Sequence, residues 1–225
     1  MSLIGKTRSK KLIKFIHFKT MITIIDYGAG NIGSIQNMIK KMGGKSIISS
    51  CPKEISVAKK LILPGVGSFD FGMNNLKKNN LIDVLHNKVI ENKTPILGIC
   101  LGMQLMTLES QEGDLPGLGW INAKVKKFEP PEKKFKIPHM GWNKVKIVKS
   151  SKLFSDSSSN QILRKFYFVH SYYVECFDSK DILGSTNFIL DFTSAFEKNN
   201  IIGLQFHPEK SHKYGMEIIK NFINI

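Results

Sequence analysis

Residues 95–106 read PILGICLGMQLM, and this stretch decides the fold. It opens on an apolar run that predicts a short buried strand, and the pattern after it predicts a helix near residues 102–109. Cys100 stands on the turn between the two, with Gly98 and Gly102 on either side. This is the cysteine counterpart of the G-x-S-x-G elbow, in which the glycines let strand and helix approach closely. A cysteine between glycines can also be a small buried filler, so a second signal is needed.

The second signal is QFHPE at residues 205–209, which follows an apolar strand. Residues two apart in an extended segment project to the same side, so His207 could face the elbow while Glu209 orients its imidazole. A nucleophile, a base and an orienting acid form the triad used in acyl transfer. His139 and His170 are competing bases, but the first has no acid nearby and the second has only an acid facing the other way.

The order of elements predicts the fold class. Strands are expected at 21–26, 45–49, 59–63 and 95–99, with helices over 31–42 and 70–91 between them. In the second half, strands are expected at 120–128, 141–148, 165–175, 182–188, 192–197 and 201–206, followed by a helix over 212–223. Alternating strands and helices indicate a parallel sheet with helices on both faces. We therefore expect a single-domain α/β fold with a mixed, mostly parallel central sheet and extra antiparallel strands in its second half.

Length and composition exclude several classes of protein. A chain of 225 residues favours one domain, and 42% hydrophobic with 23% charged residues is a normal globular balance. No apolar run approaches the ~20 residues of a membrane span, so no membrane association is expected. Three cysteines do not make a disulfide scaffold, and a reducing cytoplasm is the simpler expectation.

The net charge of +15 is unevenly distributed. Residues 1–20 hold five Lys, one Arg and no acid. They could be an amphipathic targeting segment, a basic arm for nucleic acid or a basic N-terminal extension before a domain spanning 21–225, and their composition favours the extension. Elsewhere the lysines are scattered and are not interleaved with aromatic residues, so nucleic-acid binding is not expected.

Two glycine-rich turns precede the elbow. The first, at 28–33, fits G-x-G-x-x-G, but no acid follows about 20 residues later, so it predicts a tight turn better than a dinucleotide site. The second, at 64–67, reads PGVG and ends a strand. Its backbone N–H groups could form an oxyanion hole with the N–H of Leu101.

Taken together, these segments resemble the class I (triad) glutamine amidotransferases over residues 21–225. The motifs that carry the resemblance are LPGVGSF at 63–69, GICLGMQLM at 98–106, PHMGWN at 138–143, FVHSYY at 168–173 and QFHPEKS at 205–211. The last three narrow it to the subfamily of glutaminase subunits of imidazole glycerol phosphate synthases.

The resemblance implies a role for each matching residue. Cys100 would attack the glutamine side-chain amide, His207 would transfer the proton and Glu209 would orient His207. The residues implied to hold the substrate are Gly65, Gly67, Gly102, Gln104, Ser171 and Tyr172, and the implied oxyanion donors are the N–H groups of Val66 and Leu101. No metal or cofactor is implied.

The resemblance also implies a partner. Family members pass ammonia to a separate (β/α)₈-barrel cyclase subunit in histidine biosynthesis, forming a heterodimer. Similar glutaminases supply ammonia for amidine formation on a surface-polysaccharide sugar, and the sequence does not separate the two acceptors. A non-catalytic binding module that keeps the fold is a third hypothesis, against which the intact set of triad residues weighs.

Overall fold

The computed structural model describes residues 21–131, 136–154 and 164–225. The predicted extension 1–20 lies outside the described residues, so it stays a prediction.

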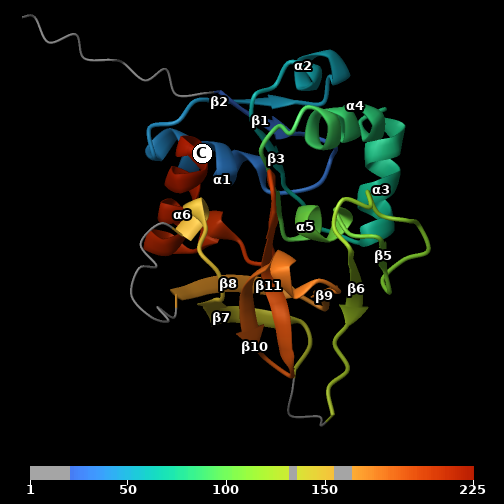
Figure 1. Cartoon of the computed structure of the whole chain (residues 1–225), viewed down its shortest axis with the longest axis vertical. Coiled ribbons are helices and arrows are strands. Elements are labelled where there is room, and N and C mark those ends of the chain that lie inside the picture. Colours follow the sequence, from blue (N-terminus) through green and yellow to red (C-terminus); the bar gives the residue numbers. More distant parts are fainter. Residues whose placement is uncertain (1–20, 132–135, 155–163) are drawn as a thin grey trace, which may run out of the picture.

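The centre of the molecule is a parallel sheet (Figure 1). Its strand order is β2 (Ser46–Ser49), β1 (Ile22–Ile25), β3 (Leu61–Leu63), β4 (Ile96–Ile99) and β12 (Ile201–Leu204). Every residue of the inner strands β1, β3 and β4 is buried, as expected where helices cover both faces of a sheet.

Helices pack on both faces of this sheet, as predicted (Figure 1). On one face, α1 (Ile32–Lys41) and α6 (His212–Asn224) share an apolar core to which Ile39 and Phe222 belong. On the other face lie α2 (Pro52–Ser56), α3 (Phe69–Lys78), α4 (Ile82–His86) and α5 (Leu101–Leu105).

The second half adds antiparallel strands to the edge at β12. They are β11 (Asp191–Lys198), β10 (Ile182–Asn187), β7 (His139–Ile147) and β8 (Arg164–His170) in that order, with β9 (Tyr172–Cys176) and then β6 (Ala123–Lys127) branching from β11. The short strand β5 (Glu109–Ser110) pairs in parallel with β6 at the end of this branch. Within the described residues this gives one 12-stranded sheet. The predicted α/β class and the antiparallel second half are confirmed.

Two predicted elements are divided in the structure. The helix expected over 70–91 breaks after α3, where Asn80 takes a φ of 56°, and it resumes as α4 followed by a π-helical turn at Asn87–Glu91. The strand expected over 165–175 is interrupted at Ser171, because β8 pairs with β7 whereas β9 pairs with β6 and β11. Helix α2 and the short strand β5 were not predicted.

Candidate active site

Cys100 occupies the sharp turn between β4 and α5. Its backbone has φ 53° and ψ −110°, a conformation that residues with a side chain rarely adopt, and its N–H donates to the Leu204 carbonyl at 2.7 Å. A Cβ atom at Gly102 would collide with the Leu63 carbonyl oxygen, and one at Gly98 would lie 2.8 Å from the Gly102 carbonyl oxygen. The glycines are therefore required by the close contact of helix and strands that the elbow pattern predicts.

His207 reaches the elbow because β12 lies beside β4. The two strands are parallel, with Leu204 opposite Ile99, so both chains leave the sheet at the same edge. Three residues beyond β12, the His207 N–H donates to the Tyr167 carbonyl at 2.9 Å, and its own carbonyl accepts from Ser211 Oγ at 2.6 Å. The backbone of the base is thus fixed on both sides.

Glu209 orients the imidazole of His207. Its Oε1 lies 2.8 Å from His207 Nδ1, and both side chains are almost fully buried, at 1% and 2% exposure. This contact favours a proton on Nδ1. Among the described residues Nε2 has no hydrogen-bond partner, which leaves it available to the Cys100 thiol beside it.

The charges of the triad reinforce one another. Burial by itself lowers the pKa of His207, but the neighbouring Cys100 sulfur and the Glu209 carboxylate outweigh burial and raise that pKa to about 10. A protonated imidazole beside the Cys100 sulfur is therefore expected near neutral pH, and such an imidazolium can act as a general acid.

Cys100 opens into a cavity of about 360 Å³. The lining residues are Val66, Gly67, Cys100, Leu101, Gln104, Glu112, Pro138, Val169, His170, Ser171 and Tyr172. Two of the predicted substrate residues, Gly65 and Gly102, are not on this surface. They lie beneath it, where a Cβ at Gly65 would come within 2.6 Å of Tyr27 Oη and 2.7 Å of Leu101 Cβ.

The two predicted oxyanion donors flank the cavity. Leu101 is the first residue of α5, so its N–H has no acceptor within the helix. On the other side, the Tyr27 hydroxyl donates to the Pro64 carbonyl at 2.6 Å and fixes the start of the PGVG turn. Val66 is 45% exposed and Gly67 takes a φ of 110°.

Two polar side chains at the site were missed from the sequence. Gln205 donates from Nε2 to Cys100 Sγ at 3.8 Å and accepts from Gln104 Nε2 at 3.1 Å. Its position two residues before His207 on an extended segment was the available signal. Glu112 is half-buried, and its Oε2 accepts from the Phe69 N–H at 2.9 Å. It lies in an irregular loop, where no periodicity points to the cavity.

The two competing bases lie next to each other. His139 Nδ1 and His170 Nε2 are 3.0 Å apart, and neither ring contacts a carboxylate in the hydrogen bonds of the described residues. Burial lowers the pKa of His139 to about 4 and that of His170 to about 3, so both are neutral near pH 7. The geometry therefore favours His207 as the base.

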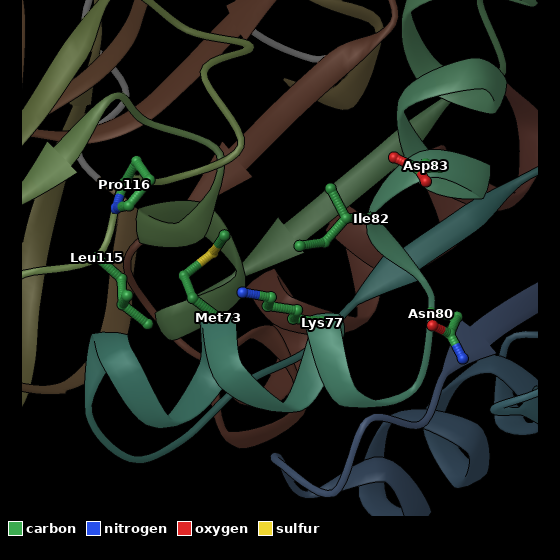
Figure 2. Close-up of a pocket in the computed structure, with 7 residues that line it drawn as sticks. All are labelled: Met73, Lys77, Asn80, Ile82, Asp83, Leu115 and Pro116. Atoms are coloured by element: carbon green, nitrogen blue, oxygen red, sulfur yellow. The ribbon is translucent and has the colours of Figure 1, made fainter.

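A second cavity, of about 410 Å³, lies between α3, α4 and the loop at Leu115 and Pro116 (Figure 2). Figure 2 shows Met73 and Lys77 on α3 facing Leu115 across it. Its charged groups, Lys77 and Asp83, are exposed. Nothing there forms a nucleophile and base pair, so it is not the catalytic site.

Membrane-spanning helices and metal centres are both absent from the described residues. No helix in that part of the chain is long and apolar enough to cross a membrane. In the same residues, no group of three or more His, Cys, Asp or Glu side chains is arranged to hold a metal ion.

Comparisons with known proteins agree with this geometry. Residues 23–225 match the family described as glutamine amidotransferase class-I. The chain is 60% identical over 203 residues to imidazole glycerol phosphate synthase subunit HisH 2 of Methanococcus maripaludis, which covers 90% of this chain and 98% of the relative. It is 47% identical over 205 residues to the subunit of the same name from Pseudomonas aeruginosa, covering 91% and 100%.

Solved structures share the fold at lower identity. PurLQS from Thermotoga maritima superposes with a TM-score of 0.70 at 15% identity, covering 92% of this chain and 98% of that one. A putative GMP synthase subunit from Thermoplasma acidophilum gives a TM-score of 0.68 at 21% identity, covering 92% and 94%.

Proposed function

Because the chain belongs to the class I glutamine amidotransferase family, we propose that it is the glutaminase subunit of an imidazole glycerol phosphate synthase. The observation that carries the proposal is the buried set of Cys100, His207 and Glu209, in which Cys100 lines a cavity large enough for one amino acid. The names of the relatives at 60% and 47% identity support this acceptor over a surface sugar.

The chemistry follows from the positions of the three groups. The Cys100 thiol gives its proton to His207, and its sulfur attacks the side-chain carbonyl carbon of glutamine. The resulting oxyanion is stabilised by the N–H of Leu101 and a donor from the PGVG turn. The imidazolium of His207 gives its proton to the leaving nitrogen, so ammonia departs and a thioester remains. Neutral His207 then takes a proton from water, which attacks the thioester. The C–S bond breaks to release glutamate, and His207 returns the proton to the sulfur and so restores the thiol.

Glu112 is the acidic residue of the cavity lining. Its carboxylate would accept a hydrogen bond from the α-ammonium group of glutamine. Gln104, Ser171 and Tyr172 line the same cavity. The proposal places the side-chain amide of the substrate at Cys100 and its charged end at Glu112.

The partner is a (β/α)₈-barrel subunit that uses the ammonia. Met140 and Trp142 on β7 are 66% and 47% exposed, and large exposed apolar side chains mark an interaction surface. They follow Pro138, which lines the cavity, so a subunit docked there would cover the active site. A cytoplasmic location is part of the proposal, since a catalytic thiolate needs a reducing compartment.

Glutamate production tests the proposal. The chain is mixed with a barrel partner and either the phosphoribulosyl acceptor or a nucleotide-activated sugar. We expect acceptor-dependent formation of glutamate and imidazole glycerol phosphate with the first. Turnover with the sugar alone would shift the function to amidine formation, and no glutaminase activity under any condition would leave a binding module.

A further inference from the structure

The proposed chemistry leaves the two buried histidines, His139 and His170, without a role. They are 4% and 7% exposed and lie within a cluster of aromatic rings formed by Phe128, Phe168 and Phe192. A polar ring in such surroundings costs free energy unless its nitrogens are hydrogen-bonded. The hydrogen bonds of the two histidines therefore indicate their role.

One assignment of protons to the ring nitrogens satisfies all of these hydrogen bonds. The Asn143 amide nitrogen can only donate, so His139 Nε2 accepts from it at 3.1 Å, and the proton of a neutral His139 stands on Nδ1. His139 Nδ1 then donates to His170 Nε2 at 3.0 Å, which puts the His170 proton on Nδ1. His170 Nδ1 donates to the Tyr172 carbonyl at 2.7 Å.

The chain of hydrogen bonds continues to the nucleophile. The Tyr172 carbonyl also accepts from Gln104 Nε2 at 3.2 Å. The same nitrogen donates to Gln205 Oε1 at 3.1 Å, and Gln205 Nε2 approaches Cys100 Sγ at 3.8 Å. One carbonyl thus joins the histidine pair to the wall of the cavity and to the sulfur.

The backbone changes strand partners next to Tyr172. Ser171 separates β8, which pairs with β7, from β9, which pairs with β6 and β11, and its carbonyl accepts from the Phe128 N–H at 3.1 Å. Ser171 and Tyr172 both line the cavity. The hydrogen bond from His170 spans this change of partners, and His139 holds the His170 ring.

We propose that His139 and His170 are positioning residues that set the Ser171–Tyr172 wall of the glutamine cavity through the Tyr172 carbonyl. His170 itself lines the cavity, and among the described residues neither ring forms a hydrogen bond with Cys100 or with a carboxylate. The two histidines act in series, His139 through His170. The inference rests on the proposed function, because the cavity is taken to bind glutamine.

Three substitutions separate positioning from packing. His170→Phe keeps an apolar ring in the aromatic cluster and removes the donor to Tyr172. His170→Asn keeps a donor near the Nδ1 position. Phe192→Leu is the matched control, because it perturbs the same cluster and makes none of the polar contacts.

Steady-state glutaminase kinetics are measured on the full chain with its barrel partner. We expect His170→Phe to raise KM for glutamine about tenfold, the scale of one lost hydrogen bond, with a smaller effect on kcat. His170→Asn should recover most of that KM, and Phe192→Leu should lower the melting temperature without changing KM. Equal KM values for His170→Phe and the unsubstituted chain would overturn the inference.

A double substitution tests the series arrangement. His139→Phe should raise KM less than His170→Phe, and the two together should match His170→Phe alone. Additive effects would show that His139 acts independently, against the proposal.

Labelling of Cys100 provides a readout that does not require turnover. A diazoketone analogue of glutamine needs the cavity, whereas iodoacetamide needs only the thiolate, and peptide mapping separates Cys100 from Cys51 and Cys176. His170→Phe should slow the first reagent relative to the second. If His170→Phe fails to fold, the ratio of the two labelling rates is measured on His139→Phe instead. A ratio equal to that of the unsubstituted chain would then overturn the inference.

The unsubstituted chain separates the two failures. If it has no glutaminase activity and its Cys100 does not react with the glutamine analogue, the proposed function fails. If it is active while every histidine variant behaves as the control does, only the positioning role fails.

Discussion

Cys100 is held in a backbone conformation of positive φ that costs free energy for any residue with a side chain. The cost is offset by neighbouring contacts, because the Cys100 N–H bonds to β12 and two glycines let α5 pack against the sheet. The strain points the sulfur away from the sheet, toward the cavity and His207. The reactivity of Cys100 thus depends on the packing of its neighbours.

The first prediction concerns Cys100. Cys100→Ala should lower glutamine turnover about 10³-fold or more, because no other group can form the thioester. The melting temperature should change little, since a smaller side chain fits the same turn. Cys51→Ser and Cys176→Ser are the controls: Cys51 is exposed, and burial raises the pKa of Cys176 to about 11, so it is a neutral thiol. Retained turnover in Cys100→Ala would contradict the assignment of Cys100 as the nucleophile.

The second prediction concerns Glu209. His207→Ala should be nearly as inactive as Cys100→Ala, whereas Glu209→Gln should lose less, because the base remains and only its orientation changes. Since Glu209 helps to raise the pKa of His207, Glu209→Gln should also move the alkaline limb of the kcat/KM profile to lower pH. An unchanged limb would mean that Glu209 has no electrostatic role.

The raised pKa of His207 also makes the stability of the fold depend on pH. The folded-state pKa of His207, about 10, lies above its ordinary value of 6.5. Protonation of His207 therefore stabilises the folded state fully below about pH 6.5, and this contribution is lost as pH rises through about 10. The difference in melting temperature between the unsubstituted chain and His207→Ala should shrink over that range.

At the scale of elements, glycine positions decide which substitutions the fold accepts. Gly102→Ala should destabilise the protein by at least about 3 kcal/mol or prevent folding, because its Cβ would collide with the Leu63 carbonyl. Gly33→Ala is the matched control on α1. Nothing lies within 4 Å of its Cβ, so it should stabilise by about 0.5–1 kcal/mol. Denaturant unfolding measures both. A tolerated Gly102→Ala would contradict the packing of the elbow.

The parallel half of the fold and the grouping of Cys100, His207 and Glu209 could be predicted because their signals are local. The apolar strand before Cys100 and the strand before His207 are each visible in a few residues, and neighbouring parallel strands bring their ends together. The break at Asn80 depends on one residue of positive φ inside an otherwise helical pattern. The division at Ser171 depends on which strands pair, a non-local property.

Other parts of the site could not be predicted from the sequence, because they too depend on non-local contacts. Glu112 reaches the cavity through an irregular loop, held by its contact with the Phe69 N–H. Gly65 matches the substrate motif but supports the cavity from below, which only the contacts with Tyr27 and Leu101 show.

At the scale of the whole molecule, β1 is the first strand of the described residues. This strand lies between β2 and β3 and is fully buried, so the described domain has an interior strand at its start. A chain beginning at Met21 should fold, bind the barrel partner and keep full glutaminase activity. Gel filtration with the partner and steady-state kinetics check this. Loss of solubility or association would assign a structural role to residues 1–20.

The last prediction concerns control of the site by the partner. Nucleophile, base and orienting acid are already in contact in the isolated chain, so the component left to regulate is the oxyanion donor. The first half of the PGVG turn is fixed by Tyr27 and by the packing of Gly65. Its second half is free, since Val66 is exposed and a Cβ at Gly67 would meet only Phe71, at 3.4 Å.

A barrel subunit that covers the cavity can therefore contact Val66 and turn its peptide toward the substrate. One missing oxyanion donor costs ~2.7–4 kcal/mol, so partner and acceptor should raise turnover by at least about 10²-fold, through kcat more than KM. Gly67→Ala tests the turn itself. At a φ of 110° a side chain destabilises the present turn by at least about 1 kcal/mol, so turnover without partner should rise about fivefold or more and stimulation should fall. If the unsubstituted chain alone already matched the rate of the complex, the turn would not be a gate, although the triad assignment would stand.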